Sequence, residues 1–300
     1  MRGSILAALP LHVMLTAIAS AQSRPPAIHA AERLPGHIVD VSAGEFFLRS
    51  PESIPSGLTS FRLRQIGDLL SNPEKVRAEN LLPATPENDP TRAFHMLWVV
   101  RMESGRTVDE WYRAKVRGEP TPWAMILGGP ASADPPRTSN ATLVLKPGTY
   151  ALVCFVGSGR QDKIRSHLLK GMFRPLTVVP STSGTVELPK PDVTARITRT
   201  GQIELSGPVR KGRRLIRVVN ETASWHEFIV ARVKKGRSTE ETAVWTRAAG
   251  TPRPFDSWGG LSDVPPGATL TITSFLEPGS YLLWTIRAPA TSLAVTVPEG

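Results

Sequence analysis

The stretch CFVGSGRQDKIRSHLLKGM, residues 154–172, decides how the rest of this 300-residue chain is interpreted. It begins with Cys154, the only cysteine in the chain, and also contains His167 and Met172. A single cysteine excludes an internal disulfide, so Cys154 is a free thiol, an intermolecular bridge or a metal ligand. Thiolate, imidazole and thioether are soft or borderline ligands that suit copper. The stretch therefore predicts a metal site.

One imidazole is missing from this set. A type-1 copper centre takes two His and one Cys in a trigonal plane, with a long, weak bond to an axial Met. His95, in the segment RAFHMLWVV, is the candidate for the second His. Taken singly, Cys154 and Met172 would be ordinary core residues and His95 a structural histidine. Their combination favours one copper ion.

The first 21 residues have the pattern of a secretory signal peptide. Arg2 precedes an apolar run from Ile5 to Ile18, and Ala19-Ser20-Ala21 matches the small-residue cleavage rule. The run is too short for a membrane anchor, and no later segment is long and apolar enough to span a bilayer. We expect an exported protein, located in the periplasm or outside the cell.

The remainder is a tandem repeat with an offset of 131 positions. This offset places His95 on His226 and Tyr150 on Tyr281, and it also superimposes glycine and Pro-Gly positions where the chain must turn. Each repeat is far longer than a solenoid unit, so two whole domains of one fold are expected. The predicted organisation is a signal peptide (1–21), an N-terminal segment (22–36), domain 1 (37–180), a linker (181–191) and domain 2 (192–300).

Apolar residues alternate with polar ones along several segments, as in half-buried strands. Phe61 and Leu63 alternate with arginines, and Leu270 and Ile272 alternate with threonines. Gly- and Pro-containing turns separate such strands, which indicates an all-β chain made of two Greek-key β-sandwiches. Two aligned capping boxes, in TVDE and STEE, predict one short helix in each repeat, at 108–116 and 239–246. The first repeat also carries an insertion at 68–90.

The ligand pattern resembles the cupredoxins, the type-1 blue copper superfamily. The likeness rests on GTYALVCFVG, SHLLKGM and LTVVP, and on a lone His on an inner strand. The resemblance implies His95, Cys154 and His167 as equatorial ligands and Met172 as the axial ligand. Many cupredoxins have an Asn after the first His, but Met96 stands here. We expect support for the thiolate to come from elsewhere, such as Ser139 to Thr142.

The second repeat lacks this ligand set. The same offset puts Thr285 at the position of Cys154, and Ala290 falls near the position of Met172. The loop that carries His167 is absent, so we expect His226 to be a buried structural histidine. Copper is therefore predicted in domain 1 only.

Electron transfer through one mononuclear copper is the leading functional hypothesis, without catalysis. No His-x-His pair for a trinuclear copper cluster occurs, and Val153 rather than His precedes Cys154. A non-catalytic binding module with structural or no copper, and a copper delivery or storage protein, remain alternatives. The net charge of +10 favours an acidic redox partner. The basic runs RKGRR and KKGR are short and contain glycine, so turns are expected rather than a nucleic-acid site.

Overall fold

A computed structural model describes residues 33–44, 46–66, 95–157, 166–181, 188–248, 253–285 and 291–299. The predicted signal peptide, the 68–90 insertion and most of the predicted linker lie outside these ranges. The same holds for Arg160, Lys163 and Arg165, between two of the predicted ligands. Within the described ranges, no helix has the length and apolar character needed to cross a membrane.

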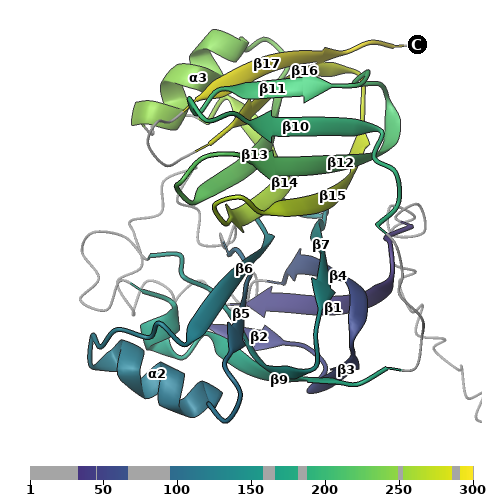
Figure 1. Cartoon of the computed structure of the whole chain (residues 1–300). Coiled ribbons are helices and arrows are strands. Elements are labelled where there is room, and N and C mark those ends of the chain that lie inside the picture. Colours follow the sequence, from purple (N-terminus) through teal and green to yellow (C-terminus); the bar gives the residue numbers. More distant parts are fainter. Residues whose placement is uncertain are drawn as a thin grey trace, which may run out of the picture.

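The N-terminal half, residues 33–181 as far as described, is a sandwich of two β-sheets (Figure 1). One sheet contains β1 (His37–Gly44), β2 (Phe47–Arg49), β4 (Gly57–Gln65) and β7 (Ser139–Leu145). The other contains β3 (Ser53–Pro55), β5 (Trp98–Met102), β6 (Ala124–Pro130), β8 (Gly148–Val153) and β9 (Phe173–Val179). Helix α2 (Val108–Val116) lies between β5 and β6, and the short helix η3 (Leu168–Lys170) precedes β9.

The C-terminal half, residues 188–299 as far as described, repeats this architecture. Its first sheet contains β10 (Val193–Ile197), β11 (Ile203–Ser206), β12 (Gly212–Asn220) and β15 (Thr269–Leu276). Its second contains β13 (His226–Val233), β14 (Phe255–Val264), β16 (Gly279–Trp284) and β17 (Ser292–Val297), and α3 (Thr239–Ala248) follows β13. The predicted fold class, two tandem Greek-key β-sandwiches each with a short helix, is confirmed.

Both sheets continue from one half into the other. Strand β7 pairs with β15, and β6 pairs with β14, which gives an eight-stranded and a nine-stranded sheet. Asn140 of β7 binds Thr273 of β15 twice, because its amide donates to the carbonyl and accepts from the N–H, each at 2.7 Å. Asn140 therefore joins the halves, and the expectation that it supports the thiolate is wrong for this residue.

The repeat is visible in backbone geometry as well as in sequence. Gly105 and its counterpart Gly236 have φ of 82° and 80°, and Gly148 and its counterpart Gly279 have φ of 148° and 142°. These angles lie in a region that side chains other than glycine rarely adopt. The two halves therefore make the same turns at the same places, as the sequence offset predicts.

A buried tyrosine closes the turn before β8 and the turn before β16. The Tyr150 hydroxyl donates to the carbonyl of Lys146 at 2.7 Å, and that of Tyr281 to the carbonyl of Glu277 at 2.9 Å. Burial raises the pKa of both phenols above the ordinary value for tyrosine. Both hydroxyls therefore remain protonated donors at neutral pH.

Both predicted capping boxes are present. The Thr107 hydroxyl accepts from the N–H of Glu110, whose carboxylate accepts from the N–H of Thr107. Ser238 and Glu241 make the same reciprocal pair before α3. The first helix has the predicted bounds, and the second extends to Ala248, slightly beyond its prediction.

Predicted alternation holds in β4 and fails in β15. Phe61 and Leu63 are buried while Arg64 is exposed. In β15, however, Thr271 and Thr273 are buried along with the leucine and isoleucine beside them. The reason is the strand junction, because Thr271 pairs with Thr142 of β7 and Thr273 is bound by Asn140.

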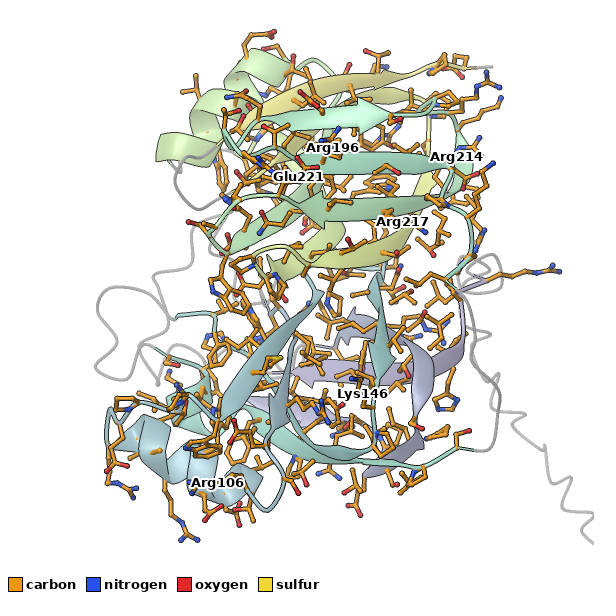
Figure 2. All side chains as sticks on the ribbon, in the orientation of Figure 1. Arg106, Lys146, Arg196, Arg214, Arg217 and Glu221 are labelled. Atoms are coloured by element: carbon orange, nitrogen blue, oxygen red, sulfur yellow. The ribbon has the colours of Figure 1, made fainter. Side chains whose placement is uncertain are left out.

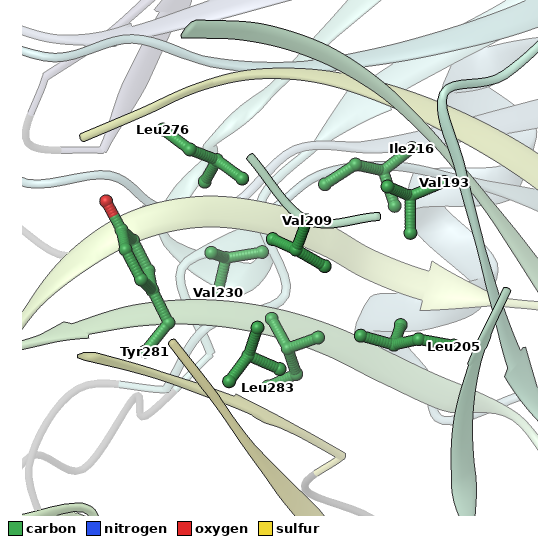
Figure 3. A pocket seen from close by; sticks show the side chains of 9 residues that line it. Val193, Leu205, Val209, Ile216, Val230, Leu276, Tyr281 and Leu283 are labelled. Atoms are coloured by element: carbon green, nitrogen blue, oxygen red, sulfur yellow. The ribbon is translucent and has the colours of Figure 1, made fainter. Parts of the chain in front are cut away.

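The two sandwiches carry residues of different size at one matching core position. Phe61 pairs with Val39 in the first, whereas the smaller Ile216 pairs with Val193 at the matching place in the second. A small cavity with wholly apolar walls lies beside Ile216 (Figure 3). Its lining is Val193, Leu205, Val209, Ile216, Val230, Leu276, Tyr281, Leu283 and Val295.

The basic run at 210–214 forms a turn and the start of β12, in line with the prediction of a turn. Figure 2 labels Arg214 at the start of β12. Its guanidinium donates to the carbonyls of Arg210 at 3.0 Å and Lys211 at 2.7 Å, so it holds the turn that precedes it. The guanidinium thus has a local structural role.

Candidate metal centre

Strand pairing brings two distant segments of the chain together at the predicted site. Strands β5 and β8 are antiparallel neighbours with Trp98 opposite Val153. His95 lies just before β5 and Cys154 just after β8, so both residues emerge at the same end of the sheet. The third residue, His167, immediately precedes η3.

The side chains of His95, Cys154 and His167 converge on one point. The two Nδ1 atoms are 3.2 Å apart, and the Cys154 Sγ lies 3.5 Å from His167 Nδ1 and 3.9 Å from His95 Nδ1. Three such donors, each about 2.0 to 2.3 Å from one ion, are roughly 3 to 4 Å apart. The observed spacing and the donor types therefore fit one copper ion.

The group is almost completely removed from solvent. His95 and Cys154 are 0% exposed, and His167 is 5% exposed. Buried imidazoles and a buried thiol at this spacing exclude water from a bound ion. His167 is the one member of the group that has any contact with the surface.

Met172 is joined to both loop ligands through its backbone. Its carbonyl accepts from the N–H of Cys154 at 3.1 Å, and its N–H donates to the carbonyl of His167 at 3.0 Å. The Met172 side chain is fully buried. The structure thus joins the fourth predicted residue to Cys154 and His167 through its backbone, and its role as the axial ligand stays a prediction.

The loop is closed at its base before it reaches His167. Gly157 and Ser166 form an isolated β-bridge, and the N–H of His167 donates to the carbonyl of Val156 at 3.0 Å. After η3, Gly171 turns the chain with φ of 91°. These contacts fix the backbone of His167 on both sides.

Gln65, at the end of β4, holds the first predicted ligand, His95, and was not itself predicted. Its Nε2 donates to the carbonyl of His95 at 2.8 Å, and Ser132 Oγ lies 3.5 Å away. The sequence does contain a signal for it. In the alternation that buries Phe61 and Leu63, Gln65 is the next inward position, where a polar residue needs a buried partner.

Phe46 and Lys170 lie next to His167. The Phe46 ring meets the imidazole edge to face at 5.2 Å, and the Lys170 ammonium lies 4.1 Å from the centre of that ring. Phe46, in the turn before β2, has φ of 61°, which is unusual for a bulky residue. An aromatic ring and a cation therefore border the part of the site closest to solvent.

Among its described residues, the equivalent end of the C-terminal half holds no such group. The N–H of Thr285 donates to the carbonyl of Thr291 at 2.9 Å, as the N–H of Cys154 does to Met172. Thr291 therefore occupies the place of Met172, and the expectation that Ala290 falls there is corrected by one residue. His226, the counterpart of His95, is fully buried. Among the described residues, the His95, Cys154 and His167 group alone has the spacing of a metal site.

The strand order of each half and this buried donor group agree with the predicted resemblance. The chain has a cupredoxin-like fold.

Comparison with known proteins adds only distant matches. No protein-family model and no curated protein sequence matches the chain. Among solved structures, auracyanin from Roseiflexus castenholzii matches at 14% identity over 48% of this chain and 98% of its own, with a TM-score of 0.28. Auracyanin B matches at 17% identity over 50% and 93%, with a TM-score of 0.28.

Copper enzymes also occur among the matches to this cupredoxin-like chain. Copper-containing nitrite reductase from Thermus scotoductus matches at 11% identity over 87% of this chain and 61% of its own, with a TM-score of 0.21. Identities and TM-scores this low carry no argument about function.

Proposed function

We propose that this protein is an exported electron carrier with one type-1 copper ion held by His95, Cys154, His167 and Met172. The observation that supports the proposal most is the buried triangle of two imidazole nitrogens and one thiol sulfur. Three donors of this kind in one plane, with a methionine beside them, are the ligand set of a blue copper site. Bound copper would supply a single electron by cycling between its two oxidation states.

The chain's contribution is to hold the donors in place. His95 is fixed by Gln65, Cys154 by Met172, and His167 by Val156. Because these restraints come from the backbone and from buried side chains, the donors do not need to move when the charge of the ion changes. Little reorganisation means fast electron exchange.

Exchange with a partner is proposed to pass through His167. Its imidazole is the part of the group with surface contact, and Phe46 and Lys170 lie beside it. The net charge of +10 favours an acidic partner over a basic one. Export follows from the predicted signal peptide, and no role in nucleic-acid binding is proposed.

We propose that the protein is not itself an enzyme. Catalysis at a lone copper needs an open coordination position, and a buried site with a methionine beside three donors leaves none evident. A fully buried Cys154 is also poorly placed to hand copper to another protein, which disfavours delivery. The alternative of a non-catalytic binding module does not explain the close spacing of the His95, Cys154 and His167 donor atoms.

Copper titration of the full mature chain tests the proposal. We expect one equivalent of copper, an intense visible band from thiolate-to-copper charge transfer, and reversible bleaching by reductant. A colourless protein with a demonstrably free thiol would reject the site. Copper released on reduction would favour delivery or storage. Turnover of nitrite or of a phenolic substrate by the copper-loaded protein would show an enzyme instead.

A further inference from the structure

The backbone that carries His95 into β5 is held partly by the C-terminal half. The carbonyl of Leu97 accepts a hydrogen bond from the Ser262 hydroxyl at 2.6 Å, and this hydroxyl also lies 3.1 Å from the carbonyl of Gly129. The next residue, Trp98, donates from Nε1 to Asp263 Oδ2 at 2.9 Å. All these contacts are buried, and they link β14 of one half to the ligand segment of the other.

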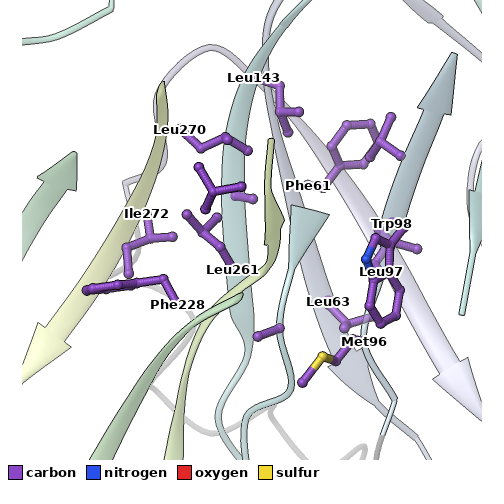
Figure 4. Packing of buried hydrophobic residues seen from close by; sticks show 14 of the residues in the cluster. Phe61, Leu63, Met96, Leu97, Trp98, Leu143, Phe228, Leu261, Leu270 and Ile272 are labelled. Carbon is purple, nitrogen blue, oxygen red and sulfur yellow. The ribbon is translucent and has the colours of Figure 1, made fainter. Parts of the chain in front are cut away.

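Two adjacent glycines make this contact possible. Asp263 pairs with Gly129 across the β14–β6 junction. A Cβ at Gly129 would overlap the carbonyl oxygen of Leu97, and a Cβ at Gly128 would overlap that of Asp263. Strand β6 therefore lies close to both β14 and the segment before β5. Figure 4 shows Leu97 and Trp98 in one continuous core with Leu261 and Phe228 of the C-terminal half.

Trp98 extends the connection to a second ligand. Its ring meets Phe155 edge to face at 5.3 Å, and Phe155 directly follows Cys154 in the chain. The position of the indole is set by its hydrogen bond to Asp263, because a buried N–H without an acceptor is costly. Asp263 thus acts, through Trp98, on the segments of both His95 and Cys154.

We propose that Ser262 and Asp263 of the C-terminal half are positioning residues for the copper centre of the N-terminal half. The inference rests on the proposed function and adds a role for the second sandwich. Ser262 restrains the backbone that follows His95. Asp263 restrains the Trp98 indole, which lies between the segment of His95 and the segment of Cys154. A change at either residue should alter the geometry of bound copper without removing a ligand.

The test compares copper-loaded full-length variants by electron paramagnetic resonance, visible spectrum and reduction potential. Ser262→Ala removes one hydroxyl, and Asp263→Ala removes the acceptor of Trp98. We expect each to bind one copper and to shift both the copper hyperfine coupling and the ratio of the visible bands. Asp263→Asn keeps an oxygen that can accept from the indole, so its spectrum should return toward that of the parent protein. Trp98→Phe should resemble Asp263→Ala.

A matched control lies at the same junction. Asp134 pairs with Arg253 and accepts from the N–H of Ser257, which also joins the halves. Within the described part of the chain, neither Asp134 nor Arg253 has a hydrogen bond to residues 95–98 or 153–155. Asp134→Asn should lower the unfolding temperature and leave the copper spectrum unchanged. Spectra of Ser262→Ala and Asp263→Ala identical to the parent would overturn the inference, as would an equal shift in Asp134→Asn. If Asp263→Ala does not fold, the single-atom change in Ser262→Ala decides. A parent protein without a blue band would refute the proposed function itself.

Discussion

The two halves of the molecule share a frame and differ at one end of it. Both close a turn with a buried tyrosine, begin a helix with a reciprocal capping box, and bend at glycines with nearly equal φ. At the end of the sandwich that carries the predicted metal site, the C-terminal half has Thr285 where the N-terminal half has Cys154. Residues 286–290 stand there in place of the longer segment 155–171. The C-terminal sandwich therefore forms without this donor set, and the two halves differ at this end by one loop and one substitution.

Substitution of Cys154 and of its counterpart Thr285 should give the largest difference between the two halves. Cys154→Ser removes the one thiolate of the chain, and we expect complete loss of the visible charge-transfer band with the fold retained, because the change replaces a single atom. Thr285→Ser, at the matched position, should leave the band intact. Absorbance and circular dichroism of the two copper-treated variants supply the comparison. A persistent band in Cys154→Ser would contradict the ligand role.

The aligned histidines offer the next test. His95→Ala should abolish the type-1 spectrum, since it removes one of three in-plane donors. His226→Ala should keep one copper with an unchanged spectrum and destabilise the fold by about 2 to 4 kcal/mol, as other truncations of buried side chains do. Denaturant unfolding and metal analysis measure both effects. Copper lost from His226→Ala in a folded protein would show that the comparison is wrong.

Met172 should tune the copper without being required for it. Met172→Leu keeps the volume and the two backbone hydrogen bonds but removes the sulfur. We expect the visible band to remain and the reduction potential to rise, because the thioether stabilises the oxidised ion more than the reduced one. Met102→Leu, in the buried part of β5, is the control and should leave the potential unchanged. Equal potentials in all three proteins would exclude an axial role for Met172.

The two tyrosines should behave alike if the frames are equivalent. Tyr150→Phe loses one hydrogen bond and Tyr281→Phe loses two, because the Tyr281 hydroxyl also accepts from the N–H of Glu277 at 3.0 Å. We expect about 1 kcal/mol of destabilisation from the first change and about 1 to 2 kcal/mol from the second. Burial raises the folded-state pKa of both phenols, so their contribution is complete below the pKa of an unfolded tyrosine and declines as pH rises through the folded value. Unfolding measured from pH 7 to alkaline pH should therefore show a smaller loss in the double variant. A large difference between the single variants would break the equivalence.

Lys170 should give the smallest effect. It lies beside Phe46 near the exposed edge of His167, so Lys170→Gln should slow electron exchange with an acidic cytochrome by less than about tenfold and weaken its salt dependence. Lys146→Gln, at the other end of β8, should change neither. Stopped-flow traces across a salt series distinguish them. Equal rates of electron exchange for both variants and the parent would show that Lys170 does not help the acidic cytochrome to bind.

Sequence patterns predicted the features that depend on local chemistry. Capping boxes, glycine turns and the spacing of Cys154, His167 and Met172 are each written within a short segment. The pairing of β7 with β15 is not, because it depends on Asn140 meeting Thr273 across the molecule. The same applies to Ser262 and Asp263, whose contact with Leu97 and Trp98 requires two glycines in a third strand. Alternation therefore failed in β15, where β7 of the N-terminal half buries the threonines.

The continuous sheets also bear on what a truncated chain would do. Strands β6 and β7 are interior strands only because β14 and β15 cover them. A product ending near Pro180 would present both as open edges, with unpaired backbone groups able to accept a strand from a neighbouring molecule. The second sandwich in this sense protects the first against aggregation, because it covers two strand edges that would otherwise be open.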